Sequence, residues 1–183
     1  GTPAMTATSG PGLSLMVEAM GLAVAAEIPT VVVDVMRGGP STGTPTKSEQ
    51  TDLNLALYGL HGDAPHLVLG ALDHADCILT TEWAVRLSEA LQTLVLVLSD
   101  QYLGQSRVVM AKPKYRLPKI PPRSIAKKGD NYQRYQVTES GVSPMAIPGT
   151  ASLMYVADGL EHAESGKPSG AAVDHQSQLD KRQ

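Results

Sequence analysis

The chain has 183 residues, of which 42% are hydrophobic and only 4% aromatic, so it is long enough for one domain and part of another and must build an aliphatic core. No apolar run reaches the roughly 18 residues that span a bilayer, and no signal peptide begins the chain, so we expect a cytoplasmic protein with no membrane partner. The net charge of −3 is unevenly divided. Residues 1–105 hold three basic and eleven acidic residues, whereas residues 106–183 hold twelve and seven.

The first 104 residues alternate between short apolar runs and longer segments in which apolar residues recur every three or four positions. The short runs are typical of strands and the periodic segments of helices. In chain order, the pattern predicts a strand at 4–8, a helix at 12–27, a strand at 31–35, a helix at 48–60, a strand at 66–71, a helix at 73–91 and a strand at 94–99.

Helix signals set the boundaries of the first helix. Ser9 suits the N-cap, Pro11 suits the first turn, and Pro29 ends the helix. Its apolar face is predicted to consist of Leu13, Met16, Val17, Met20 and Val24. The second helix is predicted to place three leucines on one side: Leu53, Leu57 and Leu60.

The predicted strands are continuous apolar runs rather than alternating ones, which indicates that both faces of the sheet are buried. Their alternation with helices implies parallel strands joined by right-handed crossovers, that is, a doubly wound parallel α/β sheet. Ligands of such sheets bind at the carboxyl edge. Three strand exits are expected to meet there: Ser9-Gly10, Arg37-Gly38 and Ser99-Asp100.

Residues 105–183 hold seven of the 13 prolines and little periodicity, so we place a domain boundary near Gly104. They begin as a basic, Pro-rich extended arm with interleaved tyrosines, whose cations are Lys112, Lys114, Arg116, Lys119, Arg123, Lys127, Lys128 and Arg134. We expect this arm to wrap an acidic subunit surface rather than to bind nucleic acid. A strand or hairpin is predicted at 135–142, a turn at 144–149, and a final helix, the start of a following domain, capped by Ser169.

The loop Thr8-Ser9-Gly10-Pro11-Gly12 is a candidate anion site. Its glycines leave the backbone N–H groups at the helix start accessible, and the helix dipole favours negative charge there. It matches neither a dinucleotide fingerprint nor a Walker loop. A plain tight turn between strand and helix is the alternative interpretation.

Arg37 lies in a second loop, at the exit of a buried strand. Its guanidinium suits two-point contact with a carboxylate, and Ser41, Thr42 and Thr46 add hydroxyl donors. These residues together indicate a site for an anionic substrate. The alternative is a structural ion pair between Arg37 and Asp100.

Other reactive residues form no recognisable catalytic arrangement. The histidines lack metal-ligand spacing and Ser9 lacks evident triad partners, so neither a metal site nor a hydrolase triad is predicted. Glu18 and Glu27 are expected on the solvent side of the first helix, not as acid–base catalysts. The single cysteine, Cys77, is expected to be a small buried residue, and it excludes an internal disulfide or a self-contained iron–sulfur cluster.

Several motifs together resemble the α subunit of 2-oxoacid:ferredoxin oxidoreductases, and the closest match is the 2-oxoglutarate type, 2-oxoglutarate synthase. The similarity runs over nearly the whole chain. The motifs are Met5-Thr6-Ala7-Thr8-Ser9-Gly10-Pro11-Gly12, Arg37-Gly38-Gly39-Pro40-Ser41-Thr42-Gly43-x-Pro45-Thr46, Gln50-x-Asp52-Leu53, His61-Gly62-Asp63, Leu98-Ser99-Asp100-Gln101-Tyr102-Leu103, Ser143-Pro144-Met145-x-Ile147-Pro148-Gly149 and Asp158-Gly159-Leu160-Glu161-His162.

The resemblance implies oxidative decarboxylation of a 2-oxoacid to its acyl-coenzyme A, with electrons passed to ferredoxin. It implies thiamine diphosphate with Mg²⁺ shared with a β subunit, and an iron–sulfur cluster on that partner. Residues 1–104 would be the later part of the pyrimidine-binding domain. The thiamine pocket would involve Thr8, Ser9, Gly10 and Pro11. The substrate would be held by Arg37, Thr46, Ser41 and Thr42.

Three departures from the family pattern limit this resemblance: the upstream segment with its activating glutamate, the later α/β domain expected beyond Gln183, and Leu91-Gln92-Thr93-Leu94 in place of a Tyr-Gln-x-Pro turn. The family's upstream Tyr-Pro-Ile-Thr-Pro segment and its activating glutamate have no counterpart here, and the chain begins without Met. We therefore expect an internal fragment of a longer subunit, inactive alone. The alternatives are a non-catalytic truncated paralogue that acts as an interaction subunit, an oxidoreductase for pyruvate or branched-chain 2-oxoacids, and a plain anion-binding α/β module.

Overall fold

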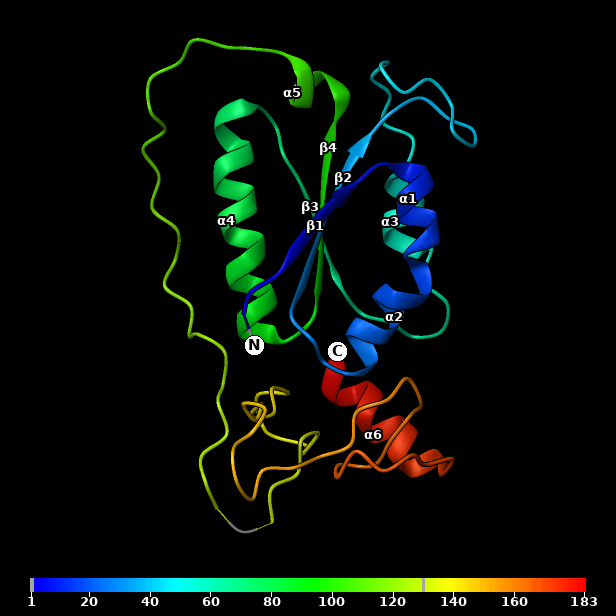
Figure 1. Ribbon diagram of the computed structural model, residues 1–183, viewed down its shortest axis with the longest axis vertical. Helices are drawn as coiled ribbons and strands as arrows, with labels where there is room; N and C mark the ends of the chain where they lie inside the picture. The colour runs from blue at the N-terminus through cyan, green and yellow to red at the C-terminus, as the bar shows by residue number, and fades with distance from the viewer. Residues whose placement is uncertain (1, 130) are drawn as a thin grey trace.

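A four-stranded parallel sheet forms the centre of the computed structural model, which describes residues 2–129 and 131–183 (Figure 1). The strands lie in the order β1-β2-β4-β3, with register pairs Met5↔Val31, Thr30↔Leu94 and Leu67↔Val95. Their bounds are β1 Met5–Thr8, β2 Thr30–Met36, β3 Leu67–Gly70 and β4 Leu94–Asp100. The predicted strands and their parallel pairing are confirmed.

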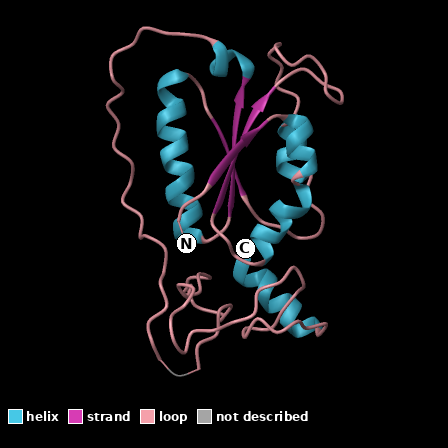
Figure 2. Ribbon diagram, in the orientation of Figure 1, coloured by secondary structure: helices cyan, strands magenta, loops and turns pink. Residues whose placement is uncertain are grey.

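Helices cover both faces of this sheet, which confirms the doubly wound α/β fold (Figure 2). One face carries α1 (Gly10–Leu15), α2 (Val17–Ala25) and α3 (Leu53–Tyr58), and the other carries α4 (His74–Leu91). The short helix α5 (Gln101–Gln105) follows β4, and α6 (Ala172–Arg182) lies near the end of the chain. Within the described ranges, no helix is long and apolar enough to cross a bilayer.

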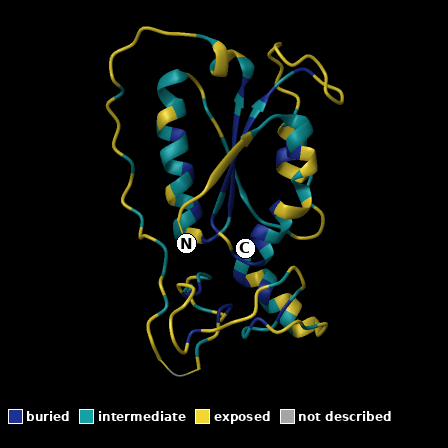
Figure 3. Cartoon of the chain, viewed as in Figure 1, coloured by how far each residue is buried: buried dark blue, intermediate teal, exposed yellow. Residues whose placement is uncertain are grey.

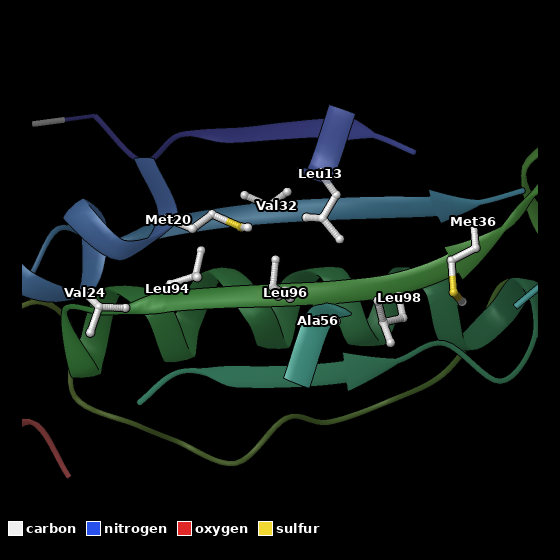
Figure 4. Close-up of a cluster of buried hydrophobic side chains, with 9 residues drawn as sticks. All are labelled: Leu13, Met20, Val24, Val32, Met36, Ala56, Leu94, Leu96 and Leu98. Carbon is white, nitrogen blue, oxygen red and sulfur yellow. The ribbon is translucent and has the colours of Figure 1, made fainter. Parts of the chain in front are cut away.

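The core is built on β2 and β4, whose side chains alternate between the two helical layers. Figure 4 shows the cluster on the α1–α3 face, formed by Leu13, Met20, Val24, Val32, Met36, Ala56, Leu94, Leu96 and Leu98. A smaller cluster under α4 consists of Val31, Ala84, Val95 and Val97. Each fully buried aliphatic side chain stabilises the fold by about 1.5–3 kcal/mol, so the exits of β2 and β4 project from a rigid base.

The two edge strands are not buried on both faces, contrary to the expectation for all four strands. Three of the four residues of β1 are exposed, and Met5 keeps 50% of its surface in contact with solvent (Figure 3). The residues of β3 are half-buried or exposed. An edge strand has a neighbour on one side only, so an apolar run alone does not distinguish it from a central strand.

The helix predicted at 12–27 is divided in two at Met16. There the backbone N–H donates to the carbonyl of Leu13 at 3.0 Å, a three-residue bond that tightens the turn. This break keeps Leu13 of α1 and Met20 of α2 directed at the same face of the sheet. Ser9 occupies the N-cap of α1, but its side chain makes no capping bond.

The helix predicted at 48–60 is wrong in length, because only α3, six residues long, is helical there. Leu53 and Leu57 are 50% and 40% exposed, whereas Leu55 and Ala56 pack on the core. Residues 48–52 instead run as a loop, held by the amide of Gln50, which donates to Asp100 at 2.9 Å. A tertiary contact here overrides the helical pattern.

The region after residue 130 has little regular structure before α6. The strand predicted at 135–142 is absent from these described residues. A turn does form within 144–149, where the N–H of Thr150 donates to Ile147 at 3.1 Å. The final helix is present, but its N-cap is Ala171 rather than Ser169, whose hydroxyl bonds to Asp174 at 2.6 Å.

The basic arm runs beside α4 of its own chain (Figure 1). Two of its hydrogen-bonding contacts there are with acidic side chains of the helix. Tyr115 donates to Glu82 at 2.8 Å, and Arg123 makes a two-point contact with Glu89, its Nε lying 2.8 Å from Oε2. The acidic surface that these arm residues follow is therefore α4.

Glu27 is buried, contrary to the expectation that it faces solvent; Glu18 is exposed as expected. Because α2 ends at Ala25, Glu27 lies beyond the helix. Its left-handed backbone conformation (φ 52°) takes its side chain out of the helical pattern and into the protein interior. Its carboxylate forms ion pairs with Arg134, at 3.3 Å, and with Lys181. These pairs join the sheet domain to the C-terminal region.

Candidate functional site

The loop that follows β2 closes on itself. The N–H of Gly38 donates to Lys47 at 3.1 Å, and the N–H of Thr44 donates to Gly38 at 2.9 Å. Gly43 has a positive φ of 59°, and a Cβ at this position would lie 1.7 Å from the Gly38 carbonyl oxygen. Only glycine fits this close approach, so Gly43 is required for the closed conformation of the loop.

The turn between β1 and α1 also depends on glycine. A Cβ on Gly12 would lie 1.9 Å from the Thr8 hydroxyl, and one on Gly10 would lie 2.7 Å from Oδ2 of Asp52. The absence of side chains therefore allows Thr8 and the loop at 48–52 to pack directly against the first turn of α1.

A cavity of about 690 Å³ lies between these two loops. Its walls come from α1 and the turn before it, from the loop after β2, and from residues 49–55. Among the predicted site residues, the structure brings together Gly10, Pro11, Arg37, Ser41 and Thr42. It does not place Thr8, Ser9 or Thr46 in the wall, and Thr46 is exposed on the loop.

Arg37 is the cationic residue of this cavity wall. Its Nε is buried and has no hydrogen-bond partner among the residues that the structure describes. The alternative ion pair with Asp100 is not formed. Asp100 instead accepts hydrogen bonds at 2.9 Å from the N–H of Leu103 and from Gln50. Although burial alone would raise the pKa of Asp100, these bonds hold it below its usual value.

A carboxyl pair, Asp34 and Asp52, lies under the same wall and was missed by sequence reasoning. Asp34 is completely buried on β2 and neither of its carboxyl oxygens accepts a hydrogen bond from the described residues, while Asp52, which lines the cavity, is close enough to interact with it. Burial, reinforced by the charge of Asp52, raises the pKa of Asp34 to about 7. The sequence signal for a buried acidic group was an aspartate inside the apolar run of β2. The residues near it in the chain did not indicate which group would be its neighbour.

In the described part of the chain, no group of three or more His, Cys, Asp or Glu side chains is arranged to hold a metal ion. Cys77 is only partly buried, on α4, and burial together with Asp76 raises the pKa of its thiol, which makes it a poor nucleophile.

Comparison with known families gives one match along almost the whole chain. The family described as "Pyruvate flavodoxin/ferredoxin oxidoreductase, thiamine diP-bdg" matches residues 1–181. A solved structure, "2-oxoglutarate:ferredoxin oxidoreductase from Magnetococcus marinus with 2-oxoglutarate, coenzyme A and succinyl-CoA bound", is similar with a TM-score of 0.93 and 47% identity. That similarity covers 100% of this chain and 32% of the other.

Curated relatives agree with this match. The chain is 40% identical over its full length to 2-oxoacid:ferredoxin oxidoreductase 1, subunit alpha, of Sulfurisphaera tokodaii, of which it spans 29%. Over 96% of its length it is 43% identical to the 2-oxoglutarate oxidoreductase subunit KorA of Mycobacterium tuberculosis, of which it spans 27%. The chain thus spans less than a third of these two relatives. It belongs to the family of 2-oxoacid:ferredoxin oxidoreductase α subunits, within their thiamine diphosphate-binding domain.

Proposed function

We propose that this chain is part of an enzyme that oxidatively decarboxylates 2-oxoglutarate to succinyl-coenzyme A and reduces ferredoxin, and that Arg37 binds a carboxylate of the substrate. The observation that carries the proposal is the buried guanidinium Nε of Arg37, which has no acceptor among the described residues and lies in the wall of a cavity. A buried N–H without an acceptor is costly, and a bound carboxylate would satisfy Nε together with a terminal nitrogen of the guanidinium in two-point geometry.

The loop around Arg37 supports a dicarboxylate substrate. Ser41 and Thr42 line the same cavity and offer hydroxyl donors in addition to Arg37, as a substrate with a second carboxylate or a keto oxygen would need. The Magnetococcus marinus structure holds 2-oxoglutarate and succinyl-coenzyme A, which supports the same substrate class for this chain. Thr46, exposed on the loop, is proposed to join the substrate contacts only in the complete enzyme.

The cavity also fits a role beside the cofactor. Thiamine diphosphate, when bound, supplies the carbanion chemistry of decarboxylation. On this chain, Gly10 and Pro11 form a wall without bulky side chains, while Thr8 and Ser9 stand behind them and hold the turn. We propose that Mg²⁺ and the iron–sulfur cluster are held with or by the β subunit, so that ferredoxin and coenzyme A act on the assembled enzyme.

Substitution of Arg37 in the complete enzyme tests the proposal. Arg37→Ala is expected to raise KM for 2-oxoglutarate by about ten- to hundredfold, because a charge-assisted hydrogen bond is worth roughly 1.5–3 kcal/mol. Arg37→Lys should give a smaller increase, since it keeps the charge but not the planar fork. Arg86→Ala, on the exposed side of α4, is the matched control.

The choice of substrate decides between the alternatives. Turnover of 2-oxoglutarate above pyruvate and branched-chain 2-oxoacids supports the proposal, and a preference for either of the others would reassign the substrate. An assembled complex without turnover of any 2-oxoacid would favour the interaction-subunit alternative. Unchanged KM in Arg37→Ala would remove this residue from the substrate site.

A further inference from the structure

We propose that Asp34 keeps a proton that it donates to Asp52, and that this acid–carboxylate pair positions the wall of the substrate cavity. In this arrangement Asp34 is a positioning residue that acts through Asp52. The inference concerns the same cavity and therefore rests on the proposed function, but the presence of the shared proton can be measured without it.

The carboxyl pair is isolated from other partners. Asp34 is 0% exposed, neither of its oxygens accepts a hydrogen bond from the described residues, and Asp52 is the acidic group that interacts with it. Asp52 receives one bond, from the hydroxyl of Thr51 at 3.3 Å, and its Oδ2 is buried without a further donor in the described chain. Asp34 is out of contact with water and its neighbour Asp52 is also an acid, so ionising both carboxyl groups is costly and one proton is shared.

No cation on the surrounding elements replaces that proton. The loop after β2 contributes Arg37, which forms no ion pair with either aspartate, and residues 49–52 contribute Glu49 besides Asp52 itself. From β4, Asp100 adds a further negative charge, already bonded to Gln50 and Leu103. The helices α1 and α3 carry no acidic residue in the first turn and no basic residue in the last. The raised pKa of Asp34 agrees with this arrangement.

The pair has a direct mechanical link to the cavity. Asp52 packs on Gly10, where a Cβ would come within 2.7 Å of its Oδ2, and its carbonyl accepts the N–H of Ala56 at 2.8 Å at the start of α3. Its neighbours Glu49 and Thr51 line the cavity. Loss of the shared proton would place two negative charges in contact, and the segment at 49–52 would have to withdraw from the turn before α1.

The experiment uses the full-length subunit in its native assembly. In the unsubstituted enzyme, KM for 2-oxoglutarate is expected to rise above pH 7, by up to about tenfold per pH unit, while kcat changes little. Asp34→Asn donates a similar hydrogen bond without titrating, so its KM should stay low and lose this rise. Asp34→Leu should have a raised KM at every pH. Glu18→Gln, on the exposed face of α2, is the control.

A spectroscopic readout separates this inference from the proposed function. The infrared spectrum of the unsubstituted assembly near pH 6 should contain a protonated carboxyl band that disappears above pH 8 and is absent from Asp34→Asn. This band decides the inference even if no 2-oxoacid is turned over. Its absence from the unsubstituted protein, or an unchanged pH profile of KM in Asp34→Asn, would overturn the shared proton while leaving the role of Arg37 intact. If Asp34→Asn fails to fold, Asp52→Asn serves the same purpose, because the new amide would donate a hydrogen bond to Asp34 and no shared proton would be needed.

Discussion

Two carboxylates are buried at opposite ends of β2, and the protein compensates them in different ways. Glu27 precedes the strand, is 6% exposed and contacts two cations, Arg134 and Lys181. Asp34 lies near the carboxyl end of the strand, is 0% exposed and contacts another carboxyl group, Asp52. The first charge is balanced by side chains and the second by a proton.

This difference matches the position of each group. The partners of Glu27 are 107 and 154 residues away in the chain, so its ion pairs connect distant segments. Asp52 lines the cavity, so loss of the proton shared with Asp34 would change the position of the cavity wall as pH rises. A buried cation network is suited to permanent assembly, whereas a shared proton is suited to a site that must change.

The largest expected effect comes from breaking the network at Glu27. Glu27→Gln keeps the volume but leaves Arg134 and Lys181 buried without a counter-charge, and removal of one member of a buried pair costs about 3–5 kcal/mol. We expect the urea denaturation midpoint of the full-length subunit to fall accordingly. Glu18→Gln, at an exposed site, is the control. Equal midpoints for the two variants would contradict the structural role of the network.

The proton on Asp34 predicts a pH dependence of stability with a definite sign. In the unfolded chain this carboxyl ionises near its ordinary pKa of 3.8, whereas in the folded protein it keeps its proton to about 7. The contribution of this group to folding stability is therefore full below pH 4 and is lost as pH rises to 7, by on the order of 4 kcal/mol. Asp34→Asn should remove this slope in denaturation midpoints measured across that range. A slope that survives the substitution belongs to other groups.

Local pattern in the sequence was sufficient for the sheet and for part of the candidate site. The apolar runs of β2 and β4, the glycines and the strand exits are local signals, and they predicted the loops that hold Arg37 and Gly10 at one cavity. The two carboxylate arrangements were not predictable in this way. Glu27 looked like an ordinary helix residue because its partners are far away in the chain, and Asp52 looked like part of a helix at 48–60.

The reason for the second failure is physical. Residues 48–52 have helical periodicity, but Gln50 bonds to Asp100 and Asp52 packs on Gly10, which holds this segment as a loop. Tertiary contacts of this kind exceed the small differences in local propensity. The burial of the edge strand β1 was predicted wrongly for a similar reason. Burial depends on neighbouring elements, and the sequence of a strand alone does not show whether it has a neighbour on both sides.

An intermediate case lies between the arm and α4. Arg123 and Glu89 are 11% and 18% exposed at the side chain and make a two-point contact. Arg123→Ala should lower the stability of the subunit by about 1–2 kcal/mol, less than the loss at Glu27, because water still reaches both groups. Urea denaturation in low and high salt would check this. A loss of stability as large as that of Glu27→Gln would mean that the burial of an ion pair does not determine how much it stabilises the protein.

The smallest effect is expected at the exposed pair on the same helix. Arg86 and Glu82 lie one turn apart on α4, with side chains 44% and 38% exposed, and Glu82 also accepts the hydroxyl of Tyr115. Water screens this pair and offers each charge an alternative partner, so Arg86→Ala should leave the denaturation midpoint unchanged. A clear loss that disappears in high salt would show that this exposed pair stabilises the protein, and solvent exposure would then not explain the order of the three ion pairs.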